Sequence, residues 1–272
     1  MRRLALLLAA LLAAPAAAQG TLETADAAPR ASAPVRSGPA ADVDAAPMFY
    51  VVARDVALRE SPADLAPAVA PLRFRDGVRV LDEAGPPADG YAAGWRLVDW
   101  NGRRGYVRAA QLSNVWIRVD KSERTLFVYR GAELVRTLPA DVSMSDEDKV
   151  RRSGLGESDH YRIPEGVFFV ARRNDASQYY RAFVVSYPGP VHALRGLRDG
   201  LITEAQYQAI VRADQEGREP PMGTRLGGLI EIHGHGSGRQ RAWTRGCVAL
   251  RNVHMDELWE YVEVGTPIVI EP

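Results

Sequence analysis

Short runs of β-branched and aromatic residues, each bounded by turn residues, recur from about Met48 to the end of the chain. Such runs are typical of strands that pack one face against a core. In the first part of the chain the expected strands are 49–52, 56–58, 78–81, 95–100 and 105–107. Asn101 and Gly102 predict a two-residue hairpin turn, because both tolerate a positive φ. Five short strands within about sixty residues predict a small barrel.

The same pattern continues from Trp116, now with helices among the strands. The expected strands are 117–119, 125–129, 134–142, 166–171, 182–187, 228–232 and 268–270. One helix is expected from Thr203 to Glu216, because Thr203 and Gln206 have the spacing of a capping box. A second is expected over 252–262, where apolar residues repeat at helical spacing. The predicted fold class is therefore mainly β, β-rich with a few helices.

The N-terminus predicts export. Residues 1–18 combine a basic start, an uncharged apolar run and an Ala-x-Ala ending, which are the marks of a secretory signal peptide. An uncleaved anchor is the alternative, although the run is short for a membrane span. Residues 19–47 are rich in Ala, Pro, Ser and Asp and predict a disordered linker. No later segment is apolar enough to cross a bilayer, so we expect a periplasmic or cell-envelope protein without a membrane span after cleavage.

The formal net charge of the chain indicates whether nucleic acid is an expected partner. Lys plus Arg total 34 and Asp plus Glu total 34, so the formal net charge is zero. A protein dominated by nucleic-acid electrostatics would carry a basic excess. Nucleic acid is therefore not an expected partner.

The chain has one cysteine, Cys247. Exported proteins usually pair their cysteines in disulfides, and a single cysteine cannot do so within its own chain. Such a residue is buried and inert, pairs with another chain, or reacts. The residues around Cys247 favour a reactive cysteine.

A histidine and a Gly-rich loop precede this cysteine. The strand expected over 228–232 ends at His233 and Gly234, and thirteen residues, four of them Gly, lie between His233 and Cys247. An imidazole can hold a thiol as its nucleophilic thiolate, and the loop residues Arg239, Arg241 and Arg245 would add positive potential. Gly246 would leave backbone N–H groups free to face an oxyanion. The pattern predicts a nucleophile and a base joined by a mobile loop.

These residues resemble a known family. Ile232-His233-Gly234, a Gly-rich gap and Thr244-Arg245-Gly246-Cys247 are similar to the signature of the L,D-transpeptidase (YkuD-like) catalytic domain. The segments 163–168, 252–258 and 265–267 also match the family. The resemblance covers about 115–272 and implies an L,D-transpeptidase-like β-sandwich.

The resemblance also implies a reaction. Cys247 would attack the L,D-peptide bond of a peptidoglycan stem tetrapeptide, form a thioacyl-enzyme and release D-Ala, and an amine would take the acyl group. His233 would be the general base, oriented by the Gly234 carbonyl. Backbone N–H groups of Arg245, Gly246 and Cys247 would hold the oxyanion. Stem peptides are the implied partners, other cell-wall proteins are a further class, and no cofactor is implied.

This chain departs from the common family pattern at two positions. Many members have His where this chain has Arg245, and Arg where it has Ala249. Backbone donation would tolerate the first change, whereas the second would alter substrate binding.

Other polar and aromatic residues can be interpreted either as substrate-binding residues or as structural ones. Arg239 and Arg241 would clamp a substrate carboxylate or belong to a solvated loop. Trp243 and Tyr180 would line the cleft, although packing also explains Tyr180. His233 and His235 would share a strand face and could bind zinc with Cys247 or His254, but the spacing differs from established zinc motifs, so no metal is expected.

The first part of the chain has its own resemblance. A bacterial SH3-like domain is resembled by Val56-Ala57-Leu58-Arg59-Glu60-Ser61-Pro62, followed by Asp76-Gly77, Gly94-Trp95 and Gly105-Tyr106-Val107. Such a domain implies a wall-binding module, and a structural spacer is the alternative. The expected organisation is a signal peptide (1–18), a linker (19–47), an SH3-like barrel (48–114) and a catalytic domain (115–272).

Two other functions remain open from the sequence. The thioacyl-enzyme could pass its acyl group to water, which would make the protein an L,D-carboxypeptidase, endopeptidase or amidase. A protein of another class, a non-catalytic wall-binding protein, would keep the fold without the reaction.

Overall fold

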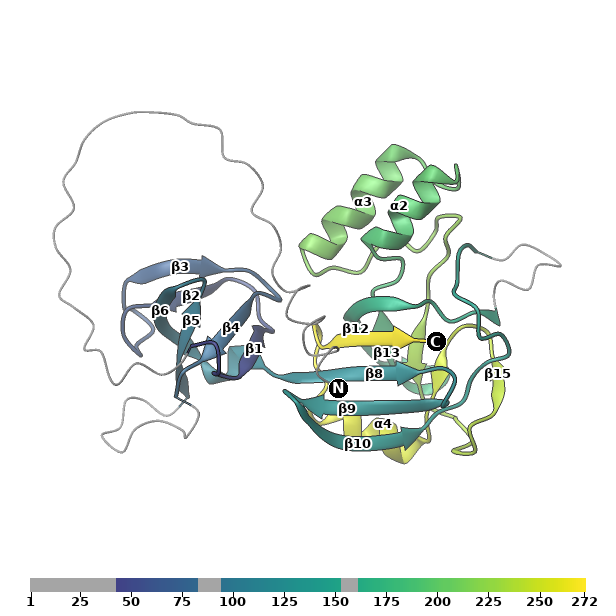
Figure 1. The fold of residues 1–272 in the computed structure, drawn as a ribbon, viewed down its shortest axis with the longest axis horizontal. Helices are drawn as coiled ribbons and strands as arrows, with labels where there is room; N and C mark the ends of the chain where they lie inside the picture. Colours follow the sequence, from purple (N-terminus) through teal and green to yellow (C-terminus); the bar gives the residue numbers. More distant parts are fainter. Residues whose placement is uncertain (1–42, 83–93, 153–160) are drawn as a thin grey trace.

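The computed structural model describes residues 43–82, 94–152 and 161–272 (Figure 1). The expected signal peptide, most of the expected linker and His160 lie outside these ranges. The first part contains β1 (Met48–Val51), β2 (Val56–Arg59), β3 (Ala68–Leu72), β4 (Gly77–Val80), β5 (Trp95–Trp100), β6 (Arg103–Arg108), the 3₁₀ turn η1 (Ala109–Gln111) and β7 (Leu112–Ser113). The second part contains β8 (Val115–Asp120), β9 (Thr125–Arg130), β10 (Glu133–Pro139), β11 (Val142–Ser143), β12 (Gly166–Ser177), β13 (Tyr180–Val185), α2 (Pro190–Arg198), α3 (Glu204–Gln215), β14 (Glu231–His233), β15 (Ala242–Thr244), β16 (Val248–Ala249), α4 (Asn252–Trp259) and β17 (Pro267–Glu271).

The first seven strands form an antiparallel sheet in the order β3-β2-β6-β5-β4-β1-β7. The expected hairpin is confirmed: Asn101 and Gly102 both have positive φ, and Trp100 pairs with Arg103. The alternate side chains of β2 and β4 point into one apolar cluster, as the period of a strand requires. We call this part the N-terminal sheet.

An eight-stranded sheet, which we call the main sheet, follows in the order β10-β9-β8-β17-β12-β13-β14-β16. It curls into a half-barrel, and the prediction of a mainly β fold is confirmed. The last strand of the chain, β17, inserts between β8 and β12, pairing parallel to β8 and antiparallel to β12. The long-range pairing makes the C-terminus part of the core, where Ile268 and Ile270 are buried.

Two helices, α2 and α3, pack against each other beside the main sheet (Figure 1). The capping box predicted for α3 is present: the Thr203 hydroxyl accepts from Gln206 N, and the Gln206 side chain accepts from Thr203 N. Ile202, Ile210 and Leu226 make a small core between the helices. No helix within the described residues is long and apolar enough to span a membrane.

The N-terminal sheet contacts the second part of the chain through the turn between β3 and β4. Phe74 in this turn meets Phe169 edge to face, with ring centroids 6.5 Å apart. A Cβ at Gly217 would lie 1.9 Å from the Phe74 ring, and one at Gly265 would lie 2.5 Å from it. Only glycine leaves room for this ring at both positions. Arg54 also donates to the Gly217 carbonyl, at 3.1 Å.

Candidate active site

The predicted pair lies at the edge of the main sheet, where His233 ends β14 and Cys247 directly precedes β16. β14 and β16 are parallel, with Ile232 opposite Val248 and His233 opposite Ala249. Ile232 and Val248 both point into the main core. Because side chains alternate along a strand, His233 projects from the other face. The two residues that the sequence paired therefore lie on neighbouring segments of one sheet edge.

The His233 imidazole is fixed from several sides. It is 2% exposed, its Nδ1 lies 2.7 Å from the Gly234 carbonyl oxygen, and its ring stacks on Tyr179 at 4.4 Å. A carbonyl oxygen can only accept a hydrogen bond, so Nδ1 carries the proton and Nε2 has a free lone pair. Burial lowers the pKa of His233, and the Gly234 carbonyl opposes this only in part. The imidazole is neutral and able to accept a proton at Nε2.

Cys247 is half-buried, and its surroundings act on the pKa of its thiol. Its Sγ lies 3.7 Å from the Leu229 carbonyl oxygen, to which a thiol can donate. Burial raises the pKa of Cys247 to about 12, and the backbone N–H of Glu231 only partly offsets this. Burial therefore favours the thiol form of Cys247 in this state. The expectation that the imidazole holds it as a thiolate stays a prediction.

Two glycines beside the pair have conformations or surroundings that exclude a side chain. Gly246 has a φ of 113°, which L side chains rarely adopt. A Cβ at Gly234 would lie 2.7 Å from the Tyr179 carbonyl oxygen and 2.7 Å from Asn252 Oδ1. The sequence marked both positions, and the structure gives each a steric reason.

The loop between His233 and Cys247 is held by one buried carboxylate. Asp141 is 0% exposed and accepts from Ser237 N at 2.6 Å, Ser237 Oγ at 2.7 Å, Arg241 N at 2.9 Å and Trp243 Nε1 at 2.7 Å. The sequence predicted a mobile loop here and did not single out Asp141. Hydrogen bonds to Asp141 instead fix the loop at Ser237, Arg241 and Trp243.

The other predicted site residues surround the pair at the surface. Arg239, Arg241 and Arg245 are exposed, and the cation that lowers the Cys247 pKa is Lys149 rather than one of them. Trp243 is 42% exposed and lies with its ring centroid 6.3 Å from that of His233. Tyr180 is also at the surface, so core packing does not explain it. Its hydroxyl lies 2.8 Å from Asp256 Oδ1.

The zinc alternative requires His235 on the same strand face as His233. That placement is wrong, because β14 ends at His233 and His235 is exposed with a φ of 61°. Within residues 43–82, 94–152 and 161–272, no group of three or more His, Cys, Asp or Glu side chains is arranged to hold a metal ion.

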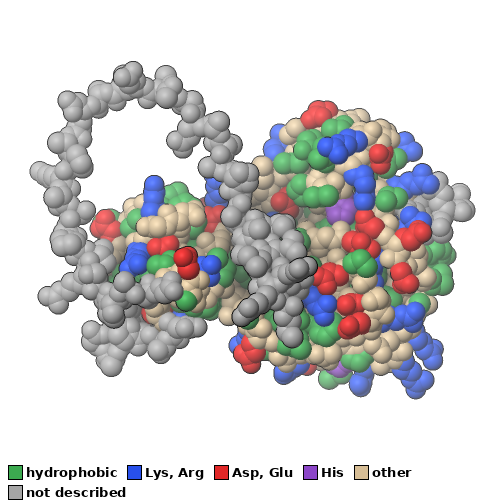
Figure 2. All heavy atoms as spheres, in the orientation of Figure 1, with side chains coloured by type: hydrophobic (Ala, Val, Ile, Leu, Met, Phe, Trp, Pro, Cys, Tyr) green, Lys and Arg blue, Asp and Glu red, His purple; other side chains and the backbone are tan. Residues whose placement is uncertain are grey.

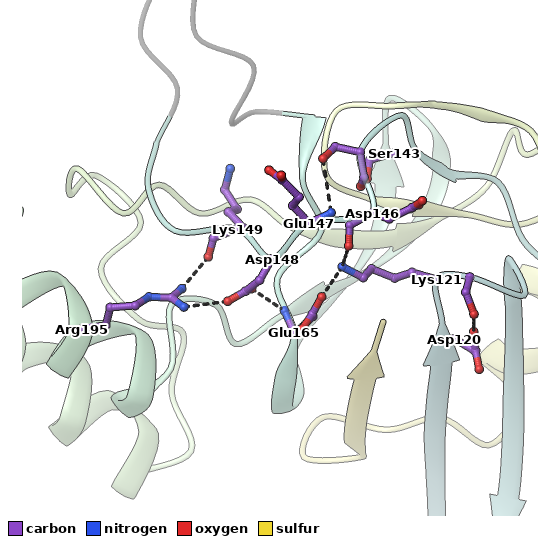
Figure 3. Close-up of polar contacts among 11 residues, drawn as sticks. Asp120, Lys121, Ser143, Asp146, Glu147, Asp148, Lys149, Glu165 and Arg195 are labelled. Carbon is purple, nitrogen blue, oxygen red and sulfur yellow. Dashed lines mark hydrogen bonds and ion pairs between the residues drawn. The ribbon is translucent and has the colours of Figure 1, made fainter.

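A segment far from the motifs completes the surroundings of Cys247. Asp148 accepts from Glu165 N at 2.9 Å, and it pairs with Arg195 of α2 at 2.7 Å (Figure 3). Arg195 also donates to the Lys149 carbonyl oxygen at 2.7 Å, while the Lys149 side chain points away from these contacts. Lys149 is 4% exposed. No local pattern marked it, because it lies about a hundred residues before Cys247 in a polar stretch.

Exposed apolar side chains lie on segments next to Cys247. Leu229, whose carbonyl faces the sulfur, is 63% exposed. Met144, which follows β11 beside β15, is 60% exposed. On the face shown in Figure 2, acidic and basic side chains are interspersed. Leu229 offers an exposed apolar side chain on the segment whose carbonyl faces the sulfur.

A curled β-sheet that carries a histidine at the end of one edge strand and a cysteine just before the next has the residue types that cysteine nucleophiles use. The chain belongs to the family of the L,D-transpeptidase catalytic domain (YkuD), whose model matches residues 114–270. This family of cysteine L,D-transpeptidases acts on peptidoglycan stem peptides in the cell envelope.

Solved structures similar to this chain include members of the same family. An L,D-transpeptidase from Xylanimonas cellulosilytica has 16% identity over 58% of this chain and 61% of its own, with a TM-score of 0.36. Bd1075 from Bdellovibrio bacteriovorus has 26% identity over 58% and 48%, with a TM-score of 0.37. The helical cell shape determining protein Pgp2 from Campylobacter jejuni has 18% identity over 58% and 47%, with a TM-score of 0.38. This chain thus spans about half to three-fifths of their length. A comparison with curated protein sequences found no match.

Proposed function

We propose that this protein is a peptidoglycan L,D-transpeptidase with Cys247 as nucleophile and His233 as general base. The observation that supports this most is the Nδ1 contact of His233 with the Gly234 carbonyl oxygen at 2.7 Å. That contact leaves Nε2 as the acceptor, at the sheet edge where Cys247 directly precedes the neighbouring strand.

The proposed reaction begins with a proton transfer. Since the pKa of Cys247 is raised to about 12, the thiol gives its proton to His233 Nε2 as the sulfur attacks. The attacked carbon is the carbonyl of the L,D bond that precedes the terminal D-Ala of a stem tetrapeptide. When the tetrahedral intermediate collapses, the C–N bond breaks, His233 returns the proton to the leaving amine, and D-Ala departs.

The thioacyl-enzyme then meets an acceptor amine. Nε2 takes a proton from the attacking amine, the new C–N bond forms, the C–S bond breaks, and the proton returns to the sulfur. Backbone N–H groups of Arg245, Gly246 and Cys247 would stabilise both oxyanions, since the positive φ of Gly246 turns the chain just before the sulfur. One donor of this kind typically lowers the barrier by about 3 kcal/mol.

The surface residues beside the pair would bind the stem. Arg239 and Arg241 are exposed guanidinium groups that match the carboxylates of the stem peptide. Trp243 and Tyr180 offer partly exposed aromatic faces. The acceptor amine belongs to a second stem or to a wall-attached protein, so peptidoglycan and other cell-wall proteins are the proposed partners.

Incubation with purified tetrapeptide muropeptides tests this function. We expect crosslinked dimers and free D-Ala by mass spectrometry, and an intact-mass increase when a carbapenem acylates Cys247. Cys247→Ser should abolish both products, and His233→Ala should slow acylation at least about a hundredfold. His235→Ala is the matched control and should retain activity. If only trimmed monomers form, the reaction is hydrolysis rather than transfer. Acylation of Cys247→Ser would contradict the assignment of Cys247 as the nucleophile.

We further propose the domain organisation that the sequence predicted: a cleaved signal peptide (1–18), a linker (19–47), an SH3-like wall-binding module (48–114) and the catalytic domain (115–272). The antiparallel N-terminal sheet supports a separate module. The proposed location is the periplasm or cell envelope. N-terminal sequencing of the protein recovered from the envelope should begin at Gln19, and an intact Met1 would contradict cleavage.

A further inference from the structure

The four hydrogen bonds on Asp141 point to a role beyond the fold. Asp141 sits just before β11, where its backbone pairs with Ala249 of β16. Its carboxylate accepts from three loop residues, Ser237, Arg241 and Trp243. Through its backbone and its carboxylate, this one residue thus connects the strand after Cys247 with the loop that precedes Cys247.

The Trp243 indole is the part of this network nearest to the chemistry. Its Nε1 donates to Asp141 Oδ2 at 2.7 Å, and its ring meets the His233 ring at 6.3 Å with an interplanar angle of 67°. Tyr179 also contacts this imidazole, stacking on it with ring centroids 4.4 Å apart. An edge contact and a stacked contact on one imidazole leave it little freedom to rotate.

We propose that Asp141 is a positioning residue that acts through the Trp243 indole to hold the His233 imidazole in its reactive orientation. The proposal rests on the role proposed above for His233. A charged acceptor suits this task because a hydrogen bond to an ionised group is stronger than one between neutral groups.

The charge state of Asp141 supports the same role. Burial opposes the ionised form, but the donors Ser237, Trp243 and Arg241 outweigh it and hold the pKa of Asp141 below its usual range. The carboxylate is therefore ionised near neutral pH, so the hydrogen bonds to Ser237, Arg241 and Trp243 have a charged acceptor there.

The test compares Asp141→Asn, Trp243→Phe and the double variant, all in the full-length protein. Asp99→Asn is the matched control, because Asp99 also accepts from a turn amide, Gly102 N at 3.0 Å, but lies on β5 in the N-terminal sheet. NMR follows the pH titration of the His233 imidazole, assigned with His233→Ala, and hydrogen exchange follows the Ser237 and Arg241 amides. Both readouts need no substrate, so they stand even if the proposed reaction fails.

We expect Asp141→Asn to accelerate exchange of the two amides roughly tenfold or more, since each loses a charged acceptor. The His233 titration should move upward in Asp141→Asn and in Trp243→Phe, and the double variant should show no further shift. With muropeptide substrate, kcat should fall in Asp141→Asn and in Trp243→Phe. An unchanged His233 titration in Trp243→Phe, or additive shifts in the double variant, would overturn the proposal, even if Asp141→Asn fails to fold.

Discussion

At the scale of residues, burial favours the protonated form of Cys247, and one buried cation opposes this effect. The pKa of Cys247 is raised to about 12 by burial, and the charge of Lys149 opposes that rise. Lys149 is itself buried, and Arg195 holds its backbone carbonyl. The pKa of Cys247 therefore depends in part on Lys149, which lies on a segment distant in the sequence.

Replacing Lys149 with Met should raise the Cys247 pKa further. Below the pKa the thiolate fraction falls with each added unit, so a rise of roughly half to one unit would slow alkylation by iodoacetamide about three- to tenfold. The rate measured from pH 7 to 10 should be lower in Lys149→Met at every pH. Arg152→Met, an exposed neighbour on the same segment, is the control. Equal rates in the wild type and Lys149→Met would contradict this assignment.

The sequence identified the residues of the site that have local signatures. His233, Gly234, Gly246 and Cys247 stand in short patterns whose chemistry can be read directly. Asp141 could not be found in this way, because it reaches the site only through the pairing of Asp141 with Ala249, over a hundred residues along the chain. Which polar residues from distant parts of the chain lie at the site is determined by long-range strand pairing, and local composition does not reveal it.

At the scale of elements, the strands with regular alternation were predicted well. The strand expected over 95–100 has those bounds in the structure, and α3 begins after Thr203 as its capping box required. The strand Ala68–Leu72 was missed because Pro71 interrupts its pattern, which an edge strand tolerates.

Helix α2 was also missed, and several strands have bounds that differ from those expected, two of them for a clear backbone reason. α2 begins with Pro190 after Gly189 and has no side-chain cap, so its start gives no capping signal. The strand expected over 134–142 ends at Pro139, since proline supplies no ladder donor. The strand expected over 228–232 is only Glu231–His233, because Leu229 has a positive φ of 55°.

At the scale of the whole molecule, the contact between the N-terminal sheet and the rest depends on the Phe74 ring. Phe74→Ala would leave the space beside Gly217 and Gly265 empty and remove the contact with Phe169. We expect a loss of about 1–3 kcal/mol, less than for a fully buried Phe because Phe74 is half-buried.

Calorimetry should show this loss as a separate, earlier unfolding transition of the N-terminal sheet. Leu65→Ala is the control, because Leu65 lies in the same sheet region but is 98% exposed. A single transition at the wild-type temperature in Phe74→Ala would show that the two parts do not depend on this ring.

The Phe74 ring packs against the backbone at Gly217 and Gly265, neither of which carries a side chain, and against the Phe169 ring. Besides the chain at Asn114, this packing joins the N-terminal sheet to the second part of the molecule. Under the proposed function, the contact would limit how far Cys247 can move relative to a surface that the N-terminal sheet binds.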